Sequence, residues 1–214
     1  SENSNAHSLY FDGNDDHVDL GFLDVVDGAS ELTVEAWLKP GSGGGIYFGH
    51  WDSLNAASNN VGLQLSVRSD NKIDIRLKPG KNSYTLNGVV DTSSWNHIAF
   101  VFKGTVAGYI NRLKVYVNGQ VSTISLGNQQ PIYSVLGNKS NRTIIGANAD
   151  LGTPYRGYLD ELRIWDYARS GSEISADHSY RLYGDESGLV GYWSFDEGSG
   201  NVVSDVSGYS GSGS

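Results

Sequence analysis

Short segments of alternating polar and apolar residues, separated by glycine-rich turns, recur along the chain. In Leu32–Lys39, for example, apolar residues alternate with Glu35 and Trp37. Only residues 170–178 resemble a helix, with a capping serine followed by Glu173. About a dozen such strands with frequent turn signals predict an all-β fold, a jelly-roll sandwich of two antiparallel sheets.

Two segments predict local parts of this architecture. Asn118-Gly119 lies between two β-rich runs, and such a pair is typical of a two-residue hairpin turn. The segment Trp95–Lys103 has aliphatic and aromatic residues on both faces, which predicts a central strand.

Two acid-bearing strands lie almost a chain length apart. In Gly157–Ser170, alternation places Asp160 on the same face as two aliphatic residues, Leu162 and Ile164. A similar pattern near the start has Asp16 in phase with the apolar residues that follow it. Because an unpaired buried carboxylate is very costly, Asp160 at the rim of a core face would need donors or a cation. Because both strands carry such an acid, we expect these two, as the first and last strands, to meet in one sheet.

The composition excludes several classes of function. A formal charge of −9 and an isoelectric point of about 4.9 argue against a nucleic-acid partner. The absence of cysteine excludes a disulfide framework and thiol chemistry. No apolar run reaches the roughly 18 residues that suggest a membrane span.

The 214 residues fit one large all-β domain. We expect residues 1–7 to be loose, residues 8–188 to form the domain and residues 209–214 to be a glycine and serine tail. Residues 189–208 allow two interpretations, because they either supply a closing strand of this domain or begin a second, truncated repeat.

Five phrases resemble, in this order, those of the laminin-G-like, concanavalin-A-like jelly-roll family: SLYFDGNDDHVDL, LTVEAWLKP, SWNHIAFVF, LKVYVNGQ and GYLDELRIWDYARSGSEI. The phrase LVGYWSFDEGSG is similar to the opening of such modules, although here it follows the body. The family includes sugar-binding modules, adhesion domains, pentraxin-like proteins and accessory domains of secreted glycan-degrading enzymes. The resemblance implies an extracellular location, secreted or at the cell surface, and one module of a multidomain chain.

Acidic residues in the two phrases predicted to pair are candidate ligands for one structural Ca²⁺ ion. Ca²⁺ takes six to eight oxygens from carboxylates, backbone carbonyls and water, and the resemblance supports an ion near these phrases. The candidate ligands are Asp12, Asp16 and Asp160, with Asp15 beside the first two. The alternative is that Asp12 and Asp16 accept turn hydrogen bonds from backbone N–H groups.

Three aromatic residues near polar loops are candidates for stacking on sugar rings: Tyr47, Trp51 and Tyr155. The alternative is that these rings pack locally beneath the loops. Trp37 and Trp95 lie in predicted strands, which favours a structural role.

The chain lacks the paired acids of related glycan hydrolases. Glu31 and Glu35 are four residues apart, a spacing that does not place an acid beside a nucleophile. The five histidines fit no metalloprotease or triad pattern. The sequence therefore predicts a non-catalytic, calcium-stabilised module that binds a carbohydrate. The alternative is an adhesion or protein-interaction module of the same fold, with a cell-surface ligand and no sugar site.

Overall fold

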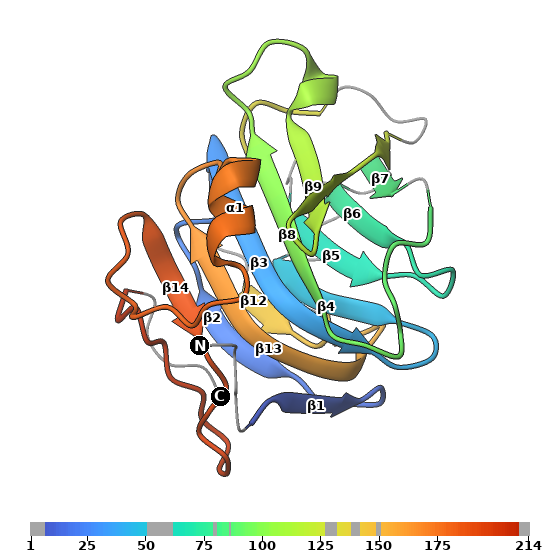
Figure 1. Ribbon diagram of the computed structural model, residues 1–214, viewed down its shortest axis with the longest axis vertical. Helices are drawn as coiled ribbons and strands as arrows, with labels where there is room; N and C mark the ends of the chain where they lie inside the picture. Colours follow the sequence, from blue (N-terminus) through green and yellow to red (C-terminus); the bar gives the residue numbers. More distant parts are fainter. Residues whose placement is uncertain are drawn as a thin grey trace.

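The computed structural model describes most of the chain, namely residues 7–50, 62–78, 81–85, 87–126, 132–137, 142–148 and 151–209. Two antiparallel sheets pack face to face (Figure 1). Sheet A has the order β1 (Leu9–Asp12), β13 (Arg156–Trp165), β3 (Glu31–Pro40), β8 (Asn96–Lys103), β9 (Leu113–Val117) and β10 (Gln120–Ser122), and β14 (Leu189–Trp193) also pairs with β13. Sheet B has the order β11 (Ile124–Ser125), β7 (Lys81–Thr85), β6 (Ile73–Lys78), β5 (Leu63–Val67), β4 (Gly45–His50), β12 (Arg142–Ile145) and β2 (Val18–Phe22). The predicted two-sheet sandwich is confirmed.

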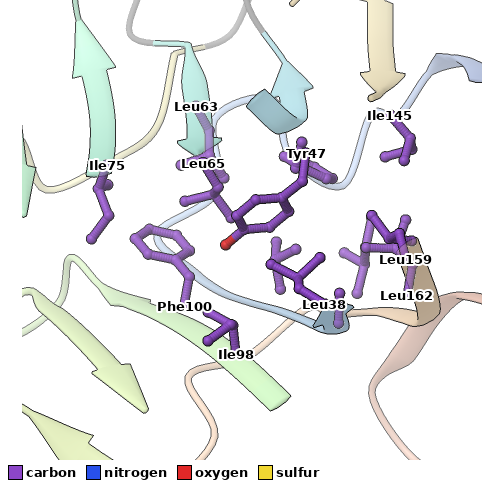
Figure 2. Packing of buried hydrophobic residues seen from close by; sticks show 14 of the residues in the cluster. Leu38, Tyr47, Leu63, Leu65, Ile75, Ile98, Phe100, Ile145, Leu159 and Leu162 are labelled. Carbon is purple, nitrogen blue, oxygen red and sulfur yellow. The ribbon is translucent and has the colours of Figure 1, made fainter. Parts of the chain in front are cut away.

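The inner faces of the two sheets meet in one apolar core (Figure 2). Alternate residues of β3, such as Val34 and Leu38, lie in this core as predicted. The central strand β8, between β3 and β9, contributes Phe100. Burying each such side chain stabilises the fold by about 1.5–3 kcal/mol, so the alternation in the sequence determines which face of each strand turns inward.

Two local predictions are also confirmed. The hairpin between β9 and β10 turns at Asn118 and Gly119, whose φ angles of 49° and 74° are the left-handed values of a type I′ turn. The helix α1 (Gly171–Asp177) begins at Ser170, whose hydroxyl accepts a hydrogen bond from the Glu173 backbone N–H. The Glu173 carboxylate accepts one in return from the Ser170 N–H at 2.7 Å, which completes a capping box. A short 3-10 turn, η2 (Tyr109–Asn111), lies between β8 and β9.

The strand β13 contains a β-bulge that alters the predicted facing of its residues. Its register with β3 shifts after Asp160, and Glu161 has a positive φ of 52°. Leu159 and Leu162 therefore both lie in the core, although they are three residues apart. The prediction that Asp160 shares a face with Leu162 is wrong, because the extra residue reverses the alternation between them.

Strand β1 pairs with β13, so the two acid-bearing strands meet in one sheet as predicted, and β14 pairs with the same edge of β13 as β1 does. β1 pairs with the first part of β13, where Leu9 is opposite Leu159. β14 pairs with the last part, where Trp193 is opposite Leu162. The segment after β14 then turns back beside it, because the Val206 N–H donates to the Tyr192 carbonyl at 2.7 Å. Residues 189–206 thus form part of the sheet A layer of this sandwich.

The helix α1 lies over sheet A (Figure 1), and a buried polar cluster lies on the outer face of this sheet next to it. Glu35 Oε1 accepts a hydrogen bond from Arg169 Nη1 at 2.7 Å, and His97 Nε2 lies 3.3 Å from Glu35 Oε2. The Arg169 guanidinium lies 4.1 Å from the ring centroid of Trp165. Burial lowers the pKa of His97 despite the neighbouring carboxylate. Burial opposes ionisation of Glu35, but His97 and Arg169 hold its pKa below the usual value.

We predict that His97 makes the fold less stable in mild acid. Its folded pKa lies below the unfolded value of about 6.5, so the unfolded chain binds a proton first as the pH falls. Stability should then fall by up to about 1.4 kcal/mol for each pH unit between the two pKa values. Thermal melts at several pH values from about 7.5 to 5 test this expectation.

The matched variants for this test are His97→Gln and His17→Gln, since His17 is exposed. The first should flatten the dependence of the melting temperature on pH in this range, and the second should leave it as in the parent chain. Equal slopes for the parent and His97→Gln would contradict the prediction.

Candidate functional site

Two of the three aromatic residues predicted to bind sugar lie in the core. Tyr47 is 1% exposed and Tyr155 is 0% exposed, and Figure 2 shows the Tyr47 ring among the core side chains. Their ring centroids are 6.4 Å apart in an edge-on arrangement, and burial raises the pKa of both hydroxyls. The prediction for these two residues is wrong, because rings this deeply buried present no face to a sugar. Beside Tyr47, the pairing of β4 with β5 is irregular between Ile46 and Phe48. Trp51 lies outside the described residues.

The turn after β1 brings three acidic side chains together. Carboxylate oxygens of Asp12, Asp15 and Asp16 all lie within 4.8 Å of one another, and all three residues are exposed. Asp12 accepts hydrogen bonds from the Asn14 backbone N–H at 2.8 Å and from its side-chain amide at 2.9 Å. Asp16 accepts one from the Asp12 N–H at 2.9 Å. The bonds from Asn14 lower the pKa of Asp12. The turn hydrogen bonds considered as the alternative are therefore present.

Asp160 does not join this acidic turn. The register of β1 places Asp12 opposite Arg156, four residues before Asp160 along β13. At about 3.3 Å per residue, Asp160 lies about 13 Å further along the strand. Its Oδ1 accepts a hydrogen bond from the Glu161 N–H at 2.9 Å. The prediction of a single ion held by Asp12 and Asp160 together is therefore wrong. Asp12 and Asp16, in contrast, lie close together.

Three exposed aromatic rings lie in a row on the outer face of sheet A, and the middle ring contacts the other two. The row lies on the β1 side of the bulge in β13, whereas β14 lies on the other side. We call Tyr10, Tyr158 and Trp95 the aromatic row. Tyr10 is directly opposite Tyr158, and their ring centroids are 4.9 Å apart. The Trp95 centroid is 6.2 Å from that of Tyr158. Tyr158 is also directly opposite Lys39 of β3, so these two side chains lie on the same face of the sheet. The three rings are 52%, 41% and 37% exposed, in the order given.

Polar groups border a cleft of about 330 Å³ beside the aromatic row. Tyr10 and Tyr158 line it together with Lys39, Thr92 and Arg156. Arg156 lies between two glycine turns, because a Cβ added at Gly13 or Gly41 would come within 3.0 or 3.2 Å of its side chain. The cleft therefore combines aromatic faces with hydrogen-bond donors and acceptors, as sites for polar organic ligands do.

Sequence reasoning missed this row for two reasons. Tyr10 alternates with the apolar residues Leu9 and Phe11, which indicates an outward ring, but only the register shows that it meets Tyr158. Trp95 was predicted to be structural, yet it precedes β8 and is partly exposed.

Hydrogen bonds link Asp27, in a turn, to His50 and Thr143 of sheet B. His50 Nε2 is 3.1 Å from Asp27 Oδ1, and its Nδ1 is 2.7 Å from Thr143 Oγ1. The order of groups is that of a catalytic triad, but Thr143 is 0% exposed and no substrate could reach its hydroxyl without rearrangement. These hydrogen bonds instead hold the turn at Asp27 against sheet B. None of the described helices is long and apolar enough to cross a membrane.

Comparison with known proteins finds one similar human protein and several solved structures of similar fold. The human protein pappalysin-1 is 25% identical over an alignment of 186 residues, which covers 80% of this chain and 11% of pappalysin-1. A Bacteroides ovatus protein, provisionally assigned as carbohydrate-binding, has a TM-score of 0.68 and 18% identity over 96% of this chain and 58% of its own. Domain 4 of an extracellular arabinanase from Geobacillus stearothermophilus, in complex with arabinotriose, has a TM-score of 0.54 and 19% identity over 82% of this chain and 78% of its own.

The chain thus spans a small part of pappalysin-1 and just over half of the Bacteroides protein. The family model of the concanavalin A-like lectin/glucanases superfamily matches residues 12–175, most of the chain. With its fold of two antiparallel sheets, the chain belongs to this superfamily.

Proposed function

We propose that this chain is a non-catalytic carbohydrate-binding module of a larger extracellular protein, and that its ligand stacks on the aromatic row. The observation that carries the proposal is the contact between three exposed rings, Tyr10, Tyr158 and Trp95, beside a polar cleft. A sugar ring presents an apolar face and a rim of hydroxyls, so it matches aromatic faces with donors and acceptors nearby. The arabinotriose-bound domain of similar fold supports this choice of ligand.

An adhesion or protein-interaction module is the second candidate. The same row favours it, because tyrosine, tryptophan and arginine are enriched among the residues that dominate protein interfaces. The modest cleft between Lys39 and Arg156 favours a small ligand over a flat protein surface. A glycan array separates the two candidates, and incubation with a panel of polysaccharides tests whether the chain cleaves any of them.

We predict that Tyr158→Ala weakens binding of the glycan identified on the array by about tenfold, because Tyr158 is the central ring of the row and stacking is worth about 1 kcal/mol or more. Isothermal titration calorimetry measures the change. The matched control is Tyr183→Ala, since Tyr183 is 89% exposed and lies outside the row. Equal affinities for Tyr158→Ala and the control would place the sugar elsewhere, and the absence of any glycan ligand would favour the protein-interaction module.

Calcium stabilisation is the second part of the proposal. Three carboxylates within 4.8 Å of one another supply hard oxygen ligands of the kind that Ca²⁺ prefers. Asp12, Asp15 and Asp16 would hold the ion, with backbone carbonyls of the turn and water completing its shell. Its role would be to stabilise the turn that follows β1, and thereby the position of Tyr10.

We predict that EDTA lowers the melting temperature and that added Ca²⁺ restores it. An ion that binds only the folded state, at 100- to 1,000-fold excess over its dissociation constant, stabilises the fold by about 3–4 kcal/mol. Asp15→Ala should abolish the response. Asp160→Ala and the exposed-loop variant Asp185→Ala should retain it. An identical melting curve in EDTA, with no metal found by elemental analysis, would refute the calcium site.

A further inference from the structure

A second cleft, of about 470 Å³, lies on the free side of β1. Its walls are β1, the residues from Asp16 to Val18, and the segment from Phe195 to Val203 that follows β14. This volume is within the usual range for small-molecule sites. We call it the end cleft.

Tyr10 connects the end cleft to the aromatic row. It lines both this cleft and the smaller cleft beside Tyr158. In the order of sheet A, β1 is next to β13, so the end cleft continues the direction set by Trp95, Tyr158 and Tyr10. A chain-like ligand on the row would therefore run past Tyr10 into the end cleft.

The polar groups of the end cleft suit a ligand rich in hydroxyls. His17 Nδ1 lies 2.9 Å from the Asp15 carbonyl, which makes Nδ1 the donor and leaves Nε2 as an acceptor. Asn201 adds an amide, which can both donate and accept. Glu197 is held in place because its Oε1 accepts a hydrogen bond from the Ser204 N–H at 2.7 Å. Leu9, which is partly buried, and Val202, which is 55% exposed, supply apolar surface for the face of a ring.

The charges of the end cleft select against an acidic ligand. Glu197 lines it and would repel a carboxylate or sulfate. Asp16 also lines it, and would add to this repulsion only where no Ca²⁺ ion is bound to it. Arg156 on β13 is opposite Asp12, and Arg181 lies 2.6 Å from Asp196, so a carboxylate partly offsets each of these cations. An uncharged sugar unit would meet no such repulsion.

We propose that the aromatic row and the end cleft form one site for an oligosaccharide, whose terminal unit is neutral and lies in the end cleft. This inference rests on the proposed carbohydrate-binding function and deepens it. It assigns a recognition role to Asn201 and His17, and it makes affinity depend on the length of the oligosaccharide.

A glycine in the segment after β14 shapes one wall of the end cleft. Gly198 has a φ of +71°, and a Cβ there would lie 3.1 Å from the His7 ring. A glycine at this position lets the segment after β14 approach His7 without strain. The wall of the end cleft is therefore set by the backbone of this segment.

The test is calorimetric titration of neutral oligosaccharides as dimers, tetramers and hexamers, from the cello-, xylo-, manno- and arabino- series. Affinity of the parent chain for one series should rise with length. Asn201→Trp, which fills the end cleft, should reduce hexamer affinity by about tenfold and remove most of the gain with length. Asn201→Ala, a milder change, should lower hexamer affinity by a few fold. An oligosaccharide that ends in a uronic acid should bind more weakly than its neutral counterpart.

Asn111→Trp is the matched control, because Asn111 is exposed in the connection between β8 and β9, at the opposite end of the molecule from β1 (Figure 1). It should bind like the parent chain, and unchanged melting temperatures show that each variant is folded. If Asn201→Trp and Asn201→Ala keep the full gain with length, the end cleft is not part of the site, although the aromatic row still stands. Equal binding of the uronic-acid-terminated sugar would overturn the neutral terminal unit. If the parent chain binds no oligosaccharide, the proposed function itself fails.

Discussion

The bulge in β13 at Glu161 determines which residues of that strand face the core. The side chains of a strand point alternately to its two faces. Without the extra residue of the bulge, every residue before it would therefore point to the opposite face. Leu159 would then leave the core and Tyr158 would enter it. The positive φ of Glu161 costs roughly 1 kcal/mol or more. Hydrogen bonds to its carboxylate from Arg163 at 2.7 Å and Tyr192 at 2.8 Å offset that cost. The exposure of the aromatic row therefore depends on a buried polar group on the same face of the sheet.

The outer face of sheet A has two regions with different roles. One lies next to α1 and buries Glu35 with Arg169. A buried ion pair adds little net stability, but the loss of either partner is costly. Such a pair therefore specifies where α1 packs more than it strengthens the fold. The other region carries Tyr158, Tyr10 and Trp95 exposed. The same sheet thus carries one region that α1 covers and a second region that is exposed to solvent.

Features set by a few neighbouring residues could be predicted from the sequence. The Asn118-Gly119 turn and the Ser170 cap depend only on local backbone geometry, and the alternation in β3 depends only on which residues are apolar. The candidate site could not be predicted in the same way. It depends on the register between strands far apart in the chain, which joins Tyr10 to Tyr158, and on bulges, which no local pattern marked. Tyr47 was misplaced because a polar loop beside it suggested exposure.

The placement of β1 and β14 on one side of β13 has a mechanical consequence. Both strands run antiparallel to β13, and Leu9 at the start of β1 and Trp193 at the end of β14 lie on either side of the bulge. A tension applied to the chain before Leu9 and after Trp193 would load the ladders at these inner ends. The hydrogen bonds that join β1 and β14 to β13 would then break one after another from these ends. In a shear geometry, by contrast, all of them would bear the force at once. Such a module would yield at low force at this seam, while the central strands β3 and β8 stay paired.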